Sequence, residues 1–288
     1  MTEPKAVRIV QISDTHLTHR GGVTNENFEL LVEFINRELR PDLVVNSGDL
    51  SLLSPDDEAD REMARHLHER LEAPVRVVPG NHDVGEVGAD PWAGFGVTGD
   101  RIAAFGSTFG PDHWLEVVGD WVVLGINSEV LSSGLAEEAE QWEWFAGLPD
   151  EISDRPAMLF LHKPLWSPVP GGAERGLSVA EADRDRLLSL LGAVDLRAVG
   201  SGHLHRYQPA AEGDLITVTA PSTAFVAKTF RMGPGLEQLG VVEYRCAGRE
   251  VVPRFRSIPT LDERQPYEID EFVATWEEIG AGPLARRG

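Results

Sequence analysis

Cysteine is almost absent from this chain, and its scarcity excludes several kinds of protein. The 288 residues include one cysteine, Cys246, so no disulfide can form within the chain. Small secreted domains depend on such bridges, and a lone cysteine in an apolar run is more typical of a buried strand than of a reactive thiol. We therefore expect neither a disulfide-stapled fold nor a cysteine nucleophile.

Long apolar runs are also missing. No stretch approaches the roughly 20 consecutive apolar residues that a membrane-spanning helix needs. The start of the chain, Met-Thr-Glu-Pro-Lys, lacks the apolar segment of a signal peptide. The sequence therefore predicts no membrane association, and a cytoplasmic location is expected by default.

Positive charge is in short supply. The chain has 26 lysines and arginines against 47 aspartates and glutamates, which gives a formal net charge of -21. Such a field repels nucleic-acid polymers and anionic membranes, so we expect neither as a partner. A small phosphate ester remains compatible with this charge, because bound divalent cations dominate the field close to them.

What the sequence does contain is a regular alternation of two patterns. Hydrophobic residues make up 42% of the chain, enough for one large domain. Short β-rich runs alternate with longer runs of helical period, which predicts an α/β fold. The expected strands are residues 7–12, 42–47, 75–79, 157–161 and 196–200. Later runs at 215–220, 240–245 and 251–257 follow without helices between them and predict a second, more antiparallel sheet.

Capping residues predict where the first helices begin. Thr24 is a candidate N-cap for a helix that ends before Pro41. Ser54 is a candidate N-cap for the next helix, with Pro55 at its first position. Each of these helices would return the chain to the start of another strand.

The remainder of the chain predicts a loop and two further helices. Residues 85–110 are rich in glycine and predict a long loop with little regular structure. Ser178 and Glu181 form a capping-box pattern before a helix. A final helix is predicted from an apolar stripe made by Ile269, Phe272, Val273 and Trp276. That stripe fits docking on the chain's own domain or a homo-oligomer contact, and the sequence leaves both open.

Polar side chains collect where the expected strands end. The residues in question are Asp14, His16, Asp49, Asn81, His162, His203 and His205. The carboxyl ends of strands in an α/β sheet share one edge, so these distant residues are expected to converge. Carboxylate, amide and imidazole groups suit a divalent transition metal, and seven of them exceed what one open site requires.

These motifs resemble those of calcineurin-like metallophosphoesterases, in particular bacterial class III cyclic-nucleotide phosphodiesterases. The matching elements, in the same order, are Asp14-x-His16, Gly48-Asp49, Gly80-Asn81-His82-Asp83, His162 and Gly202-His203-x-His205. The resemblance implies two packed mixed β-sheets flanked by helices, an αββα sandwich. It assigns residues 1–258 to a catalytic domain and leaves 259–288 as a C-terminal extension with an amphipathic helix.

The resemblance also implies a role for each ligand. Asp14, His16 and His205 would hold one metal, Asn81, His162 and His203 a second, and Asp49 would bridge them. Two divalent or mixed-valent ions of manganese, iron or zinc are implied as cofactors. Residues two apart on an extended segment point the same way, so Asp14/His16 and His203/His205 are each expected to supply adjoining ligands.

The same resemblance implies a mechanism. A hydroxide bridging the metals would attack phosphorus, His82 would act as general acid, and Asp83 would orient the imidazole of His82. One departure is the segment His162-Lys163-Pro164, where many bacterial phosphodiesterases of this superfamily carry His-His-Pro. Lys163 is expected either to add positive charge near the substrate or to point away.

The expected function is therefore metal-dependent hydrolysis of small phosphodiesters, such as cyclic nucleotides or glycerophosphodiesters. A phosphomonoesterase and a non-catalytic metal-binding scaffold are the alternatives. Aromatic residues Trp92, Phe95 and Trp166 follow ligand motifs and fit either substrate stacking or core packing. His66 and His68 lie on a predicted helix, where solvent exposure is expected.

Overall fold

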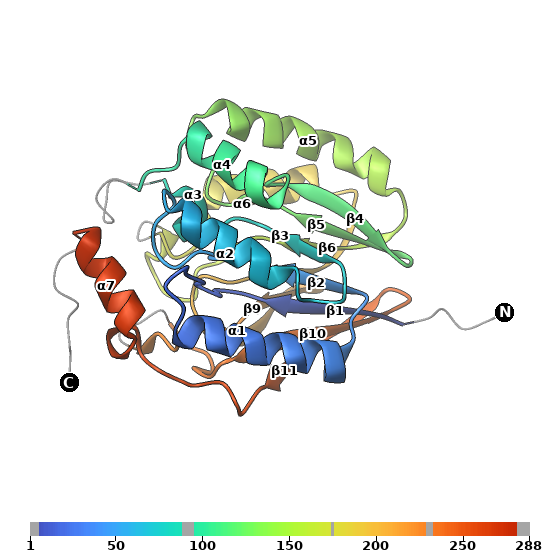
Figure 1. Cartoon of the computed structure of the whole chain (residues 1–288). Helices are drawn as coiled ribbons and strands as arrows, with labels where there is room; N and C mark the ends of the chain where they lie inside the picture. Colours follow the sequence, from blue (N-terminus) through green and yellow to red (C-terminus); the bar gives the residue numbers. More distant parts are fainter. Residues whose placement is uncertain (1–5, 88–94, 174–175, 229–232, 281–288) are drawn as a thin grey trace.

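The computed structural model describes residues 6–87, 95–173, 176–228 and 233–280 of the chain. Two mixed β-sheets pack face to face, and helices cover their outer faces (Figure 1). The αββα sandwich predicted above is confirmed. Among the described residues, no helix combines the length and the apolar character needed to cross a membrane.

The first sheet has five strands in the order β11-β10-β1-β2-β3. Their bounds are β1 Val7–Ile12, β2 Leu43–Asn46, β3 Val75–Val77, β10 Gly240–Ala247 and β11 Glu250–Ser257. Strands β1, β2 and β3 are parallel, whereas β10 and β11 join antiparallel. The helices packed on its outer face are α1 Val23–Phe34 with its π-helical continuation Ile35–Leu39, α2 Glu58–His68 and α4 Gly99–Phe109.

The second sheet has six strands in the order β4-β5-β6-β7-β9-β8. Their bounds are β4 Trp114–Val118, β5 Trp121–Gly125, β6 Pro156–Phe160, β7 Asp195–Ser201, β8 Gln208–Glu212 and β9 Leu215–Thr219. Strands β5, β6, β7 and β9 are parallel, and β4 and β8 are antiparallel edge strands. Helices α5 Ala136–Ile152 and α6 Glu181–Leu190 pack on its outer face.

Alternation along the strands explains why both faces of each sheet are buried. In β1, Ile9 contributes to the core between the sheets, while its neighbour Val10 packs under the helices. Successive strand residues point to opposite faces, so an apolar run buried on both sides is the expected signature. Cys246 in β10 also lies in the core between the sheets, where burial raises the pKa of its thiol to about 12. This confirms that it is a structural residue.

The prediction that the late strands form a second, more antiparallel sheet is wrong. Strand β9 pairs in parallel with β7, whereas β10 and β11 complete the first sheet through β1. The late strands are thus divided between both sheets, because pairing depends on which edge each strand reaches. Strands β4, β5 and β8 were not predicted.

Several helix starts differ from prediction. Gly22 is the N-cap of α1 in place of Thr24, and Ala180 is the N-cap of α6 in place of Ser178. Helix α2 is capped by Asp57, whose side chain accepts a hydrogen bond from Asp60 N at 3.0 Å, so it begins later than Ser54 predicts.

The predicted loop 85–110 contains a helix. Helix α4 begins after Thr98, whose hydroxyl accepts a hydrogen bond from Arg101 N at 3.3 Å. Its apolar residues Ile102 and Phe105 pack against the first sheet's helical layer. Two glycines inside α4 had masked this pattern, which shows that packing outweighed local propensity.

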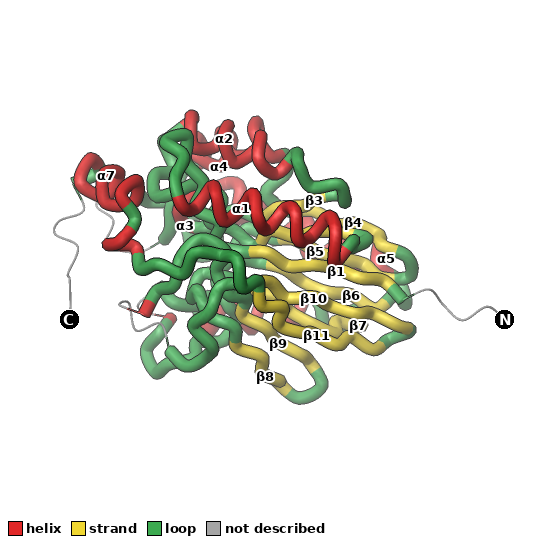
Figure 2. The backbone as a smooth tube through the Cα atoms, turned by 60° about the horizontal axis from the view of Figure 1, so that its bottom comes forward, coloured by secondary structure: helices red, strands yellow, loops and turns green. Residues whose placement is uncertain are grey.

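The C-terminal helix is present and docks on the chain itself. Helix α7 spans Asp270–Glu278, and Ile269, Phe272 and Trp276 of the predicted stripe are buried. Figures 1 and 2 show α7 at the same end of the molecule as the single-turn helix α3, Asn81–Val84. This end holds the loops that follow β1, β2 and β3.

Candidate metal centre

All seven predicted ligands lie in one place, at the carboxyl ends of five strands. Asp14 and His16 follow β1, Asp49 follows β2 and Asn81 opens α3 after β3. His162 follows β6, and His203 and His205 follow β7 in the other sheet. The site is therefore assembled where the edges of both sheets meet.

The first cluster consists of Asp14, His16, Asp49 and His205. One ligand atom from each lies within 4.8 Å of the others. His205 Nε2 is 3.3 Å from Asp14 Oδ1 and 3.2 Å from His16 Nε2. All four residues are buried.

The second cluster is centred on His162. Its Nε2 atom is 3.1 Å from Asn81 Oδ1, 3.2 Å from Asp49 Oδ2 and 3.2 Å from His203 Nδ1. The imidazole of His162 is fully buried, and His203 is partly exposed. Imidazole and oxygen atoms thus converge a second time.

Asp49 belongs to both clusters. Its Oδ1 atom accepts a hydrogen bond from His82 N at 2.9 Å, which fixes the carboxylate plane. Its Oδ2 atom lies 3.2 Å from His162 Nε2 and 3.9 Å from His16 Nε2. One carboxylate oxygen therefore stands between the two groups of ligands, as a bridging ligand requires.

Main-chain carbonyls determine which nitrogen of each imidazole faces the site. His16 Nδ1 donates to Leu52 O at 2.8 Å, and His162 Nδ1 donates to Ser47 O at 2.9 Å. His205 Nδ1 faces Phe225 O at 3.3 Å. Since a carbonyl only accepts, each of these rings carries its proton on Nδ1 when neutral and presents the Nε2 lone pair to the cluster.

Facing lone pairs are the observation that fits metal ions. The Nε2 atoms of His16 and His205 face each other at 3.2 Å, and both are acceptors when Nδ1 holds the proton. Two acceptors at that distance need a proton or a cation between them. Neutral imidazoles with carboxylate and amide oxygens form the donor set of a divalent transition metal, so the residues fit the implied ions.

Electrostatics within the site separate two of the histidines. Burial, reinforced by the nearby His205 and His82, lowers the pKa of His16 to about 3 despite the Asp49 charge. Burial opposes protonation of His162 as well, but the adjacent Asp49 carboxylate outweighs it and raises the pKa to about 10. The carboxylate of Asp49 thus favours the protonated form of His162, whereas burial favours the neutral form of His16.

Five of the predicted ligands have an unusual backbone conformation. Eight described residues other than glycine have a left-handed φ, and five of them are predicted ligands: Asp14, His16, Asp49, His203 and His205. Such conformations cost about 1–3 kcal/mol each and persist where function or packing requires them. The expectation of extended Asp14-to-His16 and His203-to-His205 segments is therefore wrong, since sharp bends bring these side chains together.

Glycines beside the ligands are explained by close approach. A Cβ on Gly48 would lie 2.5 Å from His162 Nδ1, and one on Gly80 would lie 2.2 Å from Asp49 Oδ1. A Cβ on Gly202 would lie 1.9 Å from Ser13 Oγ. The glycine in each motif thus leaves room for a ligand or its support.

His82 lies at the edge of the site without belonging to either cluster. Its Nε2 atom is 3.9 Å from Asp49 Oδ2, its ring centroid is 5.2 Å from that of His16, and its side chain is 13% exposed. Its Nδ1 atom is 3.0 Å from Leu53 O. The imidazole is therefore held through Nδ1, with Nε2 on the side that faces Asp49.

Asp83 supports the loops around the ligands. Its carboxylate accepts hydrogen bonds from Leu50 N, Ser51 N and Gly80 N at 2.8–3.1 Å. Burial, with the nearby Asp49 charge, raises the pKa of Asp83 to about 6. These bonds join the segment after β2 to the start of α3. Direct orientation of the His82 imidazole by Asp83 stays a prediction.

Lys163 points to two carboxylates. Its Nζ atom is 2.7 Å from Glu86 Oε2 and 3.0 Å from Glu129 Oε2, and its side chain is 7% exposed. Burial lowers the pKa of Lys163, but these two carboxylates outweigh it and raise it overall. The sequence left open whether Lys163 adds positive charge near the substrate or points away. In the structure its ammonium is paired with Glu86 and Glu129, so its charge neutralises buried acid.

The remaining candidates have other surroundings. Trp92 lies outside the described residues, while Phe95 and Trp166 each pack beside an arginine guanidinium. His66 is exposed as predicted, but the prediction for His68 is wrong: it is buried, and its Nε2 atom lies 2.9 Å from Asn46 Nδ2. The carbonyl partners of the ligands were missed, because no side-chain pattern marks them.

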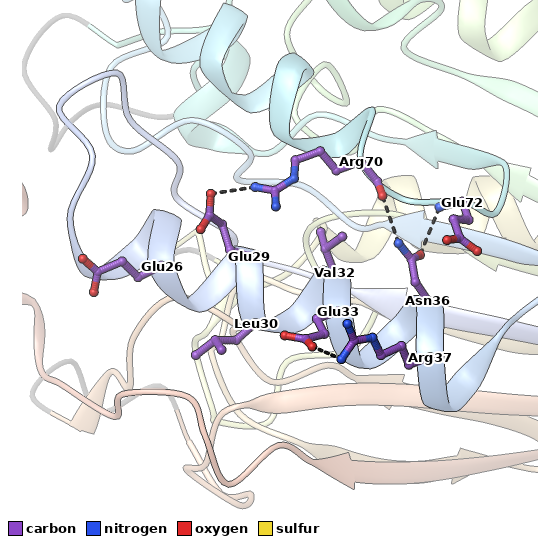
Figure 3. Close-up of a pocket in the computed structure, with 9 residues that line it drawn as sticks. All are labelled: Glu26, Glu29, Leu30, Val32, Glu33, Asn36, Arg37, Arg70 and Glu72. Carbon is purple, nitrogen blue, oxygen red and sulfur yellow. Dashed lines mark hydrogen bonds and ion pairs between the residues drawn. The ribbon is translucent and has the colours of Figure 1, made fainter.

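A surface trough of about 670 Å³ lies away from the metal ligands, along α1 (Figure 3). Arg70 reaches Glu29 at 2.6 Å, and Arg37 pairs with Glu33. Both arginines that line the trough are thus engaged with glutamates. Among the described residues that line it, the trough therefore offers a phosphate group no cation without a glutamate partner, so the predicted ligand clusters remain the candidate site.

Comparison with known proteins agrees with this geometry. A family model described as Calcineurin-like phosphoesterase matches residues 7–207, and the chain belongs to this family. The clustered aspartates and histidines correspond to the dinuclear metal centre that the family uses. The chain is thereby placed among metal-dependent hydrolases of phosphoric esters.

Individual relatives are similar at low identity. The probable glycerophosphodiester phosphodiesterase of Arcobacter nitrofigilis is 25% identical over 228 residues, covering 74% of this chain and 77% of the relative. The serine/threonine-protein phosphatase CPPED1 of Bos taurus is 28% identical over 248 residues, covering 82% and 74%. The probable cyclic nucleotide phosphodiesterase of Rhodococcus erythropolis is 27% identical over 239 residues, covering 75% and 71%.

Solved structures share the fold. A dimetal phosphatase from Danio rerio aligns with a TM-score of 0.60 at 11% identity, over 87% of this chain and 96% of that one. At this identity the likeness shows the architecture alone. Activity must be argued from the site.

Proposed function

We propose that this protein hydrolyses small phosphodiesters at a dinuclear metal centre. The observation that carries the proposal is the position of Asp49, whose Oδ2 atom lies between two groups of inward-facing imidazoles. When bound, two cations supply an activated water and clamp the phosphoryl oxygens. Manganese, iron and zinc all suit these ligands.

The protein's own groups have separable tasks in this proposal. Asp49 connects the two groups of ligands, because its carboxylate is shared between them. The imidazole of His82 donates a proton to the leaving oxygen through Nε2, since Nδ1 faces the Leu53 carbonyl. Asp83 holds the loops that carry both residues.

A diester is favoured over a monoester by the names of two relatives. These are named as phosphodiesterases of glycerophosphodiesters and of cyclic nucleotides. The net charge of -21 disfavours a nucleic-acid polymer as the substrate. A phosphomonoesterase is the second candidate, because CPPED1 is named as a phosphatase. We retain the cytoplasm as the proposed location and residues 1–258 as the proposed catalytic domain.

The test combines metal analysis with matched substrates. We expect two metals per chain after reconstitution with manganese, and faster turnover of glycerophosphoethanolamine or cyclic AMP than of glycerol 3-phosphate or AMP. Faster turnover of the monoesters would favour the phosphatase. Fewer than one bound metal per chain, with no hydrolysis, would revive the non-catalytic scaffold.

Ligand variants then test the bridging assignment. Asp49→Ala should abolish turnover and lower the occupancy of both metals, because its carboxylate is shared. His16→Ala should chiefly empty the first site and His162→Ala the second. Two fully occupied metals in Asp49→Ala would remove Asp49 from the bridging role.

A further inference from the structure

The two groups of ligands differ in what supports them from behind. In the second group, His162 Nδ1 donates to Ser47 O and His203 Nε2 lies 3.0 Å from Gly176 O. In the first group, His16 and His205 depend on the carbonyls of Leu52 and Phe225. The supporting segments of the first group lie under the C-terminal helix.

An apolar cluster joins those supporting segments to α7. Its buried members are Leu52, Leu53, Ala224, Phe225, Ile269, Phe272 and Trp276, each 8% exposed or less. Leu52 and Leu53 carry the carbonyls that face His16 and His82, respectively. The cluster therefore lies directly behind two imidazoles of the site.

Phe225 is the link between α7 and the ligands. Its ring centroid is 4.7 Å from that of His16 and 4.8 Å from that of His205. On its other side it meets Phe272 edge to face, at 5.3 Å. Phe272 in turn stacks on Trp276 at 5.8 Å. A continuous series of rings thus connects the helix to the first group of ligands.

Phe225 lies in a segment without regular secondary structure, so tertiary packing must hold it. The tail before α7 is tied to this segment, since Val226 N donates to Arg264 O at 2.9 Å. Asn27 of α1 donates to both Ala224 O and Asp262 O at 3.1 Å. These bonds seat the tail on the loop that carries Phe225.

We infer that α7 is a positioning element for the first metal site, acting through Phe272 and Phe225 on the imidazoles of His16 and His205. This inference rests on the proposed dinuclear centre. The family match ends at residue 207, so both Phe225 and α7 lie outside it. The face of α7 that carries Phe272 and Trp276 is covered by the chain itself.

The test measures binding of Mn²⁺ to the metal-free full chain by calorimetry. The first and second binding steps are assigned by their loss in His16→Ala and His162→Ala. Loss of a group that orients a metal ligand typically weakens binding about 10-fold to 100-fold. Because Phe272 acts through Phe225, we expect Phe272→Ala to weaken the first site about tenfold and the second less than about threefold.

Phe145→Ala is the matched control. Phe145 is a fully buried helical phenylalanine, but it packs on the second sheet's outer face, far along the chain from α7. The Phe145→Ala variant should lower the stability of the protein without changing the ratio of the two Mn²⁺ affinities. Phe272→Leu keeps apolar volume and should restore most of the first-site affinity. If Phe272→Ala does not fold, Trp276→Ala removes the outer ring of the stack and takes its place.

The outcomes separate the two proposals. Unchanged affinities at both sites in a folded Phe272→Ala would overturn the positioning role and leave the proposed function standing. An equal loss at both sites, matched by Phe145→Ala, would reduce α7 to general stability and also overturn it. A wild-type chain that binds fewer than two Mn²⁺ ions would instead defeat the proposed function on which the inference rests.

Discussion

Replacing His82 by alanine separates proton transfer from metal binding. The side chain is assigned as an acid, whereas its main-chain N–H donates to Asp49 Oδ1 at 2.9 Å. That main-chain bond is retained in His82→Ala, so the bridging carboxylate should keep its orientation. We therefore expect both metals to remain bound.

The expected loss of turnover depends on the leaving group. General acid catalysis contributes about 100-fold to 10,000-fold, equivalent to about 2.7–5.4 kcal/mol of activation free energy. An alkyl diester must receive a proton on its departing oxygen and should suffer this full loss. A nitrophenyl diester releases nitrophenolate, which is a stable anion and needs no proton. We therefore expect its turnover to fall by less than about tenfold.

The assay is turnover of both esters by wild type and His82→Ala, with metal content measured in each preparation. Asn81→Ala is the neighbouring control, since it removes a proposed ligand and should slow both esters alike. Equal losses on the two esters in a fully metallated His82→Ala would refute the general-acid assignment. Loss of a metal from that variant would show instead that His82 is a ligand.

Three further predictions concern stability. Chelation by EDTA should lower the melting temperature reversibly, because each metal present at 100 times its dissociation constant stabilises the fold by about 2.7 kcal/mol. Burial lowers the pKa of His68 to about 4, below its usual 6.5. Its contribution to the free energy of unfolding is therefore complete above pH 6.5 and is lost as the pH falls toward 4. Urea unfolding should show that this free energy falls by about 3 kcal/mol over that range in wild type, but not in His68→Gln. A parallel decline in His68→Gln would contradict this. Lys163→Met should lower the free energy of unfolding in urea by about 3–5 kcal/mol, because it leaves Glu129 buried without its cation. Lys228 is exposed, so Lys228→Met should leave that free energy nearly unchanged.

Much of the fold could be predicted because burial leaves a periodic record in the chain. Strands β1, β2 and β7 are apolar on both faces, and each was found within a residue or two of its observed bounds. Strands β4 and β8 were missed, since edge strands carry exposed residues and have a weaker pattern. The fully buried strand β5 was missed as well. Helix starts were missed where another residue replaced the expected cap: Gly22 in α1, Asp57 in α2 and Ala180 in α6.

The sequence by itself determined the chemistry of the site. Aspartate, asparagine and histidine at the ends of strands specify oxygen and imidazole ligands, and the order of motifs specifies the family. It also specified the stripe of α7, because a helical period needs only local residues. These properties depend on residue type and spacing, which the chain carries without folding.

Only the tertiary structure decided how those ligands are held. The nitrogen that each imidazole presents depends on a carbonyl from another segment, such as Leu52 O behind His16 or Ser47 O behind His162. Lys163 is committed to Glu86 and Glu129, and His68 is buried, through contacts across long stretches of chain. A carbonyl is common to every residue and a contact needs two distant partners, so neither leaves a local mark in the sequence; folding alone brings them together.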